Sequence, residues 1–370
     1  MLFHLFALLR SEYSVFNVFR YTSTRMGLAT LTALGITFFV APWFIARARS
    51  RQLGEVIRED GPKSHASKQG TPTMGGALIL LALAFGTLLW CDLTSQLVWL
   101  ALFVTVGYGV LGFVDDYIKI VHRNKKGVPA RYKLLAQFVV GGVAVTWLLM
   151  GDVLAPEMRT RLVLPMVSIA RFSPELSLPL YIFFGLIVVV GTSNAVNLTD
   201  GLDGLAIGPV IICAFSLMLL SYAAGATLNG FNVASYLGIA HVEGAGELAI
   251  FCGAIGGAGI GFLWYNTHPA QVFMGDVGAL SLGGALGFVA LATKTEASLP
   301  IIGGVFVAEA VSDIIQVAYY KRTKKRVFLM APIHHHFEKL GWPESRIVVR
   351  FWIVSFMCAV LGLVLTLKLR

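Results

Sequence analysis

Two adjacent carboxylates, Asp115 and Asp116, end one of the most hydrophobic stretches of the sequence, Leu97–Val114. An ionised carboxylate is costly to hold in hydrocarbon, so a pair at this place indicates a cationic partner. Hard cations such as Mg²⁺ take oxygen ligands, usually one or two carboxylates together with substrate phosphates. A carboxylate beside a second negative charge is also suited to proton removal. The pair therefore predicts a divalent-cation site or a general base, the alternative being two ordinary solvated acids at a helix end.

Two further acidic motifs lie between apolar runs. Asn197–Gly204 contains Asp200 and Asp203, which would share one face if a helix begins there, and a helix N-terminus offers free N–H groups to an anion. Phe273–Gly278 contains Asp276 between glycines, which permit close approach by a ligand. We interpret Asp276 as a metal ligand. The alternatives are a plain turn for the first motif and a helix N-cap for the second.

Three consecutive histidines, His334, His335 and His336, form an internal run. Their imidazoles cannot all point the same way, and a Zn²⁺ site would usually need a second ligand cluster, which the sequence lacks. Hydrogen bonding to phosphate or pyrophosphate is favoured over a plain basic loop. The Gly-, Thr- and Lys-containing segment 63–76 could also cradle a phosphate, but this signal is weak and a flexible basic loop is the default interpretation.

Membrane helices must position these residues. The chain of 370 residues is 56% hydrophobic and 13% charged, whereas soluble domains carry roughly 25% charged residues. The apolar runs have the length of spanning helices. We predict one all-α, polytopic integral membrane domain over residues 1–370, with residues 1–20 as an interfacial segment. The predicted spans are Thr24–Ile45, Met74–Cys91, Leu97–Val114, Leu134–Met150, Leu180–Val196, Leu205–Tyr222, Leu248–Tyr265, Val272–Ala292, Leu299–Tyr319 and Val348–Leu367.

Lysine and arginine concentrate in the loops after the first, third and ninth of these ten spans. All three loops follow odd-numbered spans, so the positive-inside rule makes their side cytoplasmic and both termini periplasmic. Parity then places Asp115, Asp116, Asp200, Asp203 and Asp276 on the cytoplasmic face together with the histidine run. The net charge of +9 is explained by topology, and we expect no nucleic-acid partner.

Carboxylates, basic residues and histidines on one face fit Mg²⁺-assisted phosphoryl transfer between a soluble donor and a lipid acceptor. A cation-coupled transporter is the competing class. It would need ionisable residues near the bilayer midplane and an inverted repeat. Glu309 and Asp313 are the main acids inside a predicted span, and we find no repeat. An intramembrane protease would need a nucleophile–base pair, and none stands out.

The chain resembles the phospho-N-acetylmuramoyl-pentapeptide transferase family nearly end to end. The acidic motifs are similar to those of the wider group of polyprenyl-phosphate sugar-1-phosphate transferases, and the histidine run points to the muramoyl-pentapeptide branch. The segments that carry the resemblance are Gly70–Gly76, Gly112–Tyr117, Asn194–Leu205, Gln271–Gly278 and Ala331–Phe337.

The resemblance implies a reaction in the bacterial cytoplasmic (inner) membrane. UDP-N-acetylmuramoyl-pentapeptide and undecaprenyl phosphate would give undecaprenyl-diphospho-muramoyl-pentapeptide (lipid I) and UMP, the first membrane step of peptidoglycan synthesis. It also implies Mg²⁺ and a homodimer. The alternative within the wider group is a polyprenyl-phosphate N-acetylhexosamine-1-phosphate transferase.

Site roles follow from the same resemblance. It implies that Asp276 binds Mg²⁺ and that Asp115, Asp116 and His335 are catalytic. Asp115 is the better candidate to deprotonate the lipid phosphate, and we favour direct attack over a covalent aspartyl intermediate. The implied nucleoside-pocket residues are Asn197, Asp200, Asp203, Asn266 and Phe273, the last stacking on uracil. The implied sugar, diphosphate and phosphate contacts are Lys68, Thr73, Lys119, Lys133, Gln316, His334 and His336.

Overall fold

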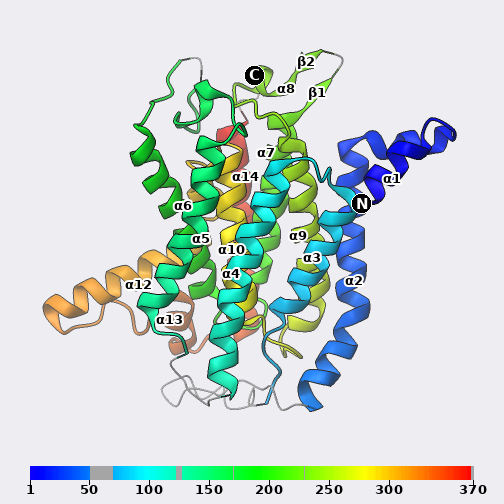
Figure 1. Cartoon of the computed structure of the whole chain (residues 1–370). Coiled ribbons are helices and arrows are strands. Elements are labelled where there is room, and N and C mark those ends of the chain that lie inside the picture. The colour runs from blue at the N-terminus through cyan, green and yellow to red at the C-terminus, as the bar shows by residue number, and fades with distance from the viewer. Residues whose placement is uncertain (51–69, 122–126, 170, 229, 368–370) are drawn as a thin grey trace.

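The computed structural model describes residues 1–50, 70–121, 127–169, 171–228 and 230–367. Its core is a bundle of long helices that run back and forth between two ends (Figure 1). The long helices are α2 (Thr22–Ser50), α3 (Gly76–Trp90), α4 (Gln96–Val121), α5 (Ala130–Met150), α6 (Leu178–Thr199), α7 (Ile207–Gly225), α9 (Ala245–Asn266), α10 (Gly275–Ala292), α12 (Gly304–Thr323) and α14 (Glu344–Thr366).

Short elements complete the described chain. A small hairpin pairs its strands antiparallel, with Thr227 opposite Asn232. The short elements are α1 (Leu2–Leu9), η1 (Ser14–Arg20), η3 (Pro156–Met158), β1 (Thr227–Leu228), β2 (Phe231–Asn232), α8 (Val233–Leu237), α11 (Leu299–Ile302) and α13 (Ile333–Lys339).

Eight of the described helices are long and apolar enough to cross a membrane, and α3 is a shorter apolar helix. This confirms the all-α, polytopic prediction. The eight are α2, α4, α5, α6, α7, α9, α10 and α14. Each predicted span except the ninth coincides with one of these nine helices.

The ninth predicted span, Leu299–Tyr319, is wrong as a single helix. The chain turns at Gly303, which separates α11 from α12. Figure 1 shows α12 projecting sideways from the bundle, above α13 and well above the lower end of α4. An apolar window cannot detect a helix break at a glycine. Beyond the break, α12 carries Glu309, which is buried, and the half-buried Gln316.

Helix α10 is the central element. All of its residues from Val277 to Ala292 are buried, and it packs against α4, α6 and α3. The contact with α4 depends on Gly112, where a Cβ atom would lie only 2.3 Å from the carbonyl oxygen of Asp276. In lipid the hydrophobic effect does not drive helices together, so their association depends on close van der Waals packing. Small residues at the contact allow that packing. The backbone at the start of α10 is therefore in contact with α4 one turn before the paired aspartates.

The two ends of the bundle hold different parts of the chain. The lower end in Figure 1 holds the end of α4, the start of α5, and α13. The hairpin, α8 and the C-terminal end lie at the upper end, and α1 lies in the upper half. The predicted parity of the spans agrees with this arrangement.

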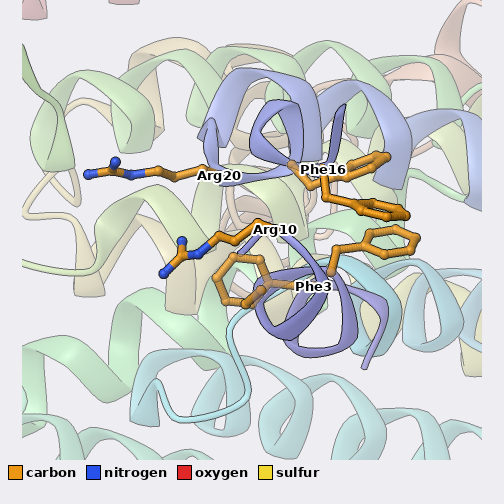
Figure 2. A pocket seen from close by; sticks show the side chains of 7 residues that line it. Phe3, Arg10, Phe16 and Arg20 are labelled. Atoms are coloured by element: carbon orange, nitrogen blue, oxygen red, sulfur yellow. The ribbon is translucent and has the colours of Figure 1, made fainter. Parts of the chain in front are cut away.

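Residues 1–20 form α1 and η1, which pack against each other through aromatic rings. The Phe6 ring stacks on Phe19 with centroids 4.3 Å apart and on Phe16 at 5.1 Å. In Figure 2, Arg10 and Arg20 extend side by side, away from these rings. Both elements carry exposed apolar side chains, among them Leu8 and Val15, and an interfacial position for this segment stays a prediction.

Candidate active site

The three aspartates of the acidic motifs meet at the lower end of the bundle. Asp115 and Asp116 are 2% and 5% exposed on α4, and Asp276 lies in the first turn of α10. Each offers a carboxylate oxygen, and the three oxygens all lie within 4.8 Å of one another. We call these residues the acidic cluster. The residues predicted to be catalytic acids and metal ligand thus share one location.

Backbone contacts between α4 and α10 fix this geometry. The N–H of Val277 donates to Asp116 Oδ2 at 3.2 Å, so one carboxylate caps an otherwise unpaired N–H at the helix N-terminus. Gly275 has a φ of +71°, and a Cβ there would lie 2.5 Å from Asp116 Oδ2. A side chain at this position would be strained and would collide with the carboxylate. Asp115 Oδ1 accepts from the N–H of Val128 at 2.7 Å.

Two lysines and an asparagine complete the cluster. Lys119 Nζ lies 2.6 Å from Asp115 Oδ2 and 3.0 Å from Asp276 Oδ2. Lys133 Nζ donates to Asp276 Oδ2 at 2.6 Å, and Asn197 Nδ2 donates to Asp276 Oδ1 at 2.7 Å. Helices α4, α5, α6 and α10 therefore each contribute a side chain. Asn197, predicted for the nucleoside pocket, lies here.

The donor chemistry of the acidic cluster fits a hard divalent cation. Three carboxyl groups face two ammonium groups, all of them within ion-pair distance of at least one partner. Oxygen-only donors at the end of a membrane helix are what Mg²⁺ prefers, together with substrate phosphates. Among the described residues, this group can therefore hold a cation and present ammonium groups to a phosphate at the same place.

Asp203 and Asn266 belong to a second group of polar residues, with partners of their own. Asp203 Oδ2 accepts from the Ala270 N–H at 3.0 Å and lies 3.2 Å from His268 Nδ1. The Asn266 side chain accepts from the Gly204 N–H at 3.0 Å and donates to the Val272 carbonyl at 2.9 Å. These bonds join the α6–α7 connection to the α9–α10 connection. Asp200 is half-buried where the first of these connections begins.

Thr73 and Phe273 lie between the two groups. The Phe273 N–H donates to the Pro72 carbonyl at 2.8 Å, and Phe273 is half-buried. The Thr73 hydroxyl would lie 3.1 Å from a Cβ on Gly275, which places it beside Asp116. The segment before α3 therefore contacts the acidic cluster through Thr73, whose contact with the sugar or diphosphate stays a prediction. Lys68, the other residue predicted in that segment, lies outside the described residues.

The three histidines have three different partners, as expected for consecutive side chains. His334 is fully buried, with Nδ1 3.1 Å from Glu309 Oε2 on α12. Its Nε2 lies 2.2 Å from where a Cβ on Gly201 would be, so the ring packs on the α6–α7 connection. His335 Nδ1 lies 2.6 Å from Glu338 Oε2, and His336 Nδ1 accepts from the Leu329 N–H at 3.2 Å.

Gln316 lies on α12 and organises the chain that leads to the histidines. Its carbonyl oxygen accepts from the N–H groups of Val327 and Phe328, and its amide nitrogen donates to the Phe328 carbonyl at 3.1 Å. In this structure Gln316 holds the α12–α13 connection, to which His336 is bonded at Leu329, while His334 contacts Glu309 of α12 directly.

Several residues at the site were given no role there by the sequence analysis. Glu344 and His268 contact the second group, and Glu309 pairs with a histidine. Glu344 could only be identified as a first-turn acid of a helix that begins after Pro343. Its partner Asp203 is 141 residues away along the chain, and no local pattern reports such a pairing.

Comparisons with known proteins find similarity over the whole chain. Residues 98–294 match the family model described as glycosyl transferase family 4, and residues 68–80 match phospho-N-acetylmuramoyl-pentapeptide-transferase signature 1. Proteins named phospho-N-acetylmuramoyl-pentapeptide-transferase are 54% identical in Sorangium cellulosum and 53% identical in Desulfatibacillum aliphaticivorans. Both alignments cover 100% of this chain and 100% of the relative. The similarity therefore extends over the whole chain, including both groups of site residues.

Proposed function

Because the chain belongs to the phospho-N-acetylmuramoyl-pentapeptide-transferase family, we propose that it transfers phospho-N-acetylmuramoyl-pentapeptide from its UDP conjugate to undecaprenyl phosphate, forming lipid I and UMP. The observation that carries this proposal is the acidic cluster, where Lys119 and Lys133 both approach Asp276 Oδ2. Phosphoryl transfer depends mainly on positioning and charge stabilisation. The cluster supplies both at the end of the bundle, where a lipid phosphate and a soluble nucleotide could meet.

Each residue of the acidic cluster has a separate role in the proposed reaction. Lys119 and Lys133 bind the diphosphate and offset the charge that develops on it. Asp115 accepts the proton of the lipid phosphate, and an oxygen of that phosphate forms a bond to the phosphorus next to the sugar. The bond from this phosphorus to the bridging oxygen breaks, and UMP leaves with the electron pair. Asp116 holds the start of α10 and keeps Asp276 in place.

Mg²⁺ is proposed as the cofactor, held by Asp276 with Asp115 and Asp116 close by. When bound, it would supply a positive charge that neutralises phosphate oxygens. His335, held by Glu338, and His336 are proposed to contact the sugar and diphosphate, and Thr73, beside Asp116, is proposed to contact them as well. In these assignments, residues in and around the acidic cluster bind the phosphate and sugar groups of the substrate.

The nucleoside is proposed to bind beside the cluster, between the connections joined by Asp203 and Asn266. Phe273 is half-buried there and offers a ring for stacking on uracil. Asp200, where the α6–α7 connection begins, is proposed to contact the nucleotide. Direct attack remains the favoured mechanism, because a phosphate dianion is already nucleophilic.

Release of UMP is the decisive assay. Purified protein with undecaprenyl phosphate and Mg²⁺ should release UMP from UDP-N-acetylmuramoyl-pentapeptide and not from UDP-N-acetylglucosamine. The reverse preference would make the protein an amino-sugar-1-phosphate transferase of the wider group. A transporter would bind or move substrate without releasing UMP, so the same assay separates all three possibilities.

The acidic cluster is proposed to face the cytoplasm in the bacterial inner membrane. Cysteine labelling in intact cells tests this. A cysteine at Lys325, in the connection before α13, should react with an impermeant maleimide only after permeabilisation, whereas one at Arg171 should react without it. The opposite pattern would overturn the orientation. We also propose a homodimer, which crosslinking in native membranes should capture as one band of twice the monomer mass.

A further inference from the structure

Glu344, the first residue of α14, contacts both connections of the proposed nucleoside pocket. Its Oε1 accepts from the backbone N–H of Asp203 at 2.7 Å, and its Oε2 lies 3.5 Å from His268 Nδ1. Only 9% of the side chain is exposed. A buried carboxylate in this position links the α6–α7 connection, the α9–α10 connection and α14.

The residues around Glu344 belong to the same linkage. His268 Nδ1 lies 3.2 Å from Asp203 Oδ2, and since an ionised carboxylate only accepts, the imidazole N–H is the donor. The Ala270 N–H donates to the same oxygen at 3.0 Å. His268 therefore lies between two buried carboxylates, Asp203 and Glu344. The start of α14, where helix N–H groups carry partial positive charge, also favours a carboxylate at this place.

Helix α14 holds the α6–α7 connection at a second point. The Trp352 indole N–H donates to the carbonyl of Gly204 at 3.1 Å. A Cβ on Gly208 would lie 2.1 Å from Trp352 Nε1, so the helix packs directly on this backbone. The position of Asp203 is thus set from α14 at the N–H of residue 203 and at the carbonyl of residue 204.

We propose that Glu344 is a positioning residue for nucleotide binding. Its carboxylate accepts from the backbone N–H of Asp203 and so holds Asp203 in position relative to the α9–α10 connection, which carries Phe273. The proposal rests on the proposed function, since these two connections are taken to bind the nucleoside. Glu344 belongs to the nucleoside end of the site and is absent from the acidic cluster. Removing it should therefore weaken nucleotide binding more than it slows the chemical step.

Three variants test this role. Glu344→Ala removes the acceptor, Glu344→Gln keeps a carbonyl oxygen for the Asp203 N–H, and Ser345→Ala changes an exposed neighbour in the same helical turn. Glu344→Ala should raise the KM for UDP-N-acetylmuramoyl-pentapeptide about tenfold. The kcat and the KM for undecaprenyl phosphate should stay close to those of the wild type. Glu344→Gln should recover most of the affinity, and Ser345→Ala should match the wild type.

Hydrogen exchange supplies a readout that does not depend on activity. Peptides covering residues 200–206 should exchange faster in Glu344→Ala than in the wild type, because the Asp203 N–H loses its acceptor. If Glu344→Ala does not fold, Glu344→Asp replaces it, since the shorter side chain cannot span the same distance. Unchanged exchange, an equal rise in both KM values, or a loss confined to kcat would overturn the proposal. Failure of the wild type to release UMP would refute the function while leaving the exchange result interpretable.

Discussion

Asp276→Asn is the substitution that most directly tests the acidic cluster. The change keeps the shape of the side chain and removes its charge. Asp276 Oδ2 lies 2.6 Å from Lys133 Nζ and 3.0 Å from Lys119 Nζ, while Oδ1 accepts from Asn197 at 2.7 Å. An asparagine retains one acceptor oxygen, and its NH₂ group cannot accept from an ammonium group. The variant therefore loses the charge that both lysines approach.

The size of the effect follows from these contacts. A hydrogen bond to a charged group contributes about 1.5–3 kcal/mol. Two such bonds weakened together correspond to about 3–6 kcal/mol, or roughly 10²–10⁴ in rate. Loss of a metal ligand adds to this, so we expect kcat to fall by about 10³ or more. The Mg²⁺ concentration needed for half-maximal activity should rise in the same variant.

The assay is UMP release from the purified protein over a series of Mg²⁺ concentrations. Asp152→Asn is a matched control, because that carboxylate is exposed and pairs only with Arg159 at 3.2 Å among the described residues. Gel filtration and the thermal midpoint must show that Asp276→Asn is folded. A folded variant with a rate within about tenfold of the wild type and an unchanged Mg²⁺ response would refute the assignment of Asp276.

Gly112→Ala should lower activity and the thermal midpoint together, since its Cβ would lie 2.3 Å from the Asp276 carbonyl oxygen. Gly142→Ala is the control and should change neither, because a Cβ there would have nothing within 4 Å. A fully active Gly112→Ala would show that α4 and α10 need not pack this closely. Lys294, between α10 and α11, has its pKa lowered by burial from 10.5 to about 8. The unfolded chain then binds more protons between these values, so the thermal midpoint in detergent should rise from pH 8 towards 10, and Lys294→Met should lose this contribution. Chelation of divalent cations should abolish UMP release and added Mg²⁺ should restore it, whereas full activity in EDTA would exclude a required metal.

Much of the fold follows from local properties of the sequence. Runs of apolar residues predict spanning helices because each helix satisfies its own backbone hydrogen bonds in lipid. Charge bias in the loops predicts their alternation. The exception is the ninth span, where the break at Gly303 and the oblique course of α12 depend on packing against the rest of the bundle. Hydropathy summed over a window carries no information about such a turn.

The candidate site divides in the same way. The sequence alone determined that Asp115, Asp116 and Asp276 lie at one end of the bundle, because the parity of the spans requires it. Only the tertiary structure decided that Asn197 approaches the acidic cluster and that Glu344 holds the Asp203 connection. Hydropathy and charge bias are properties of neighbouring residues. Pairings between residues 79 or 141 positions apart depend on how helices pack, and no local pattern records this.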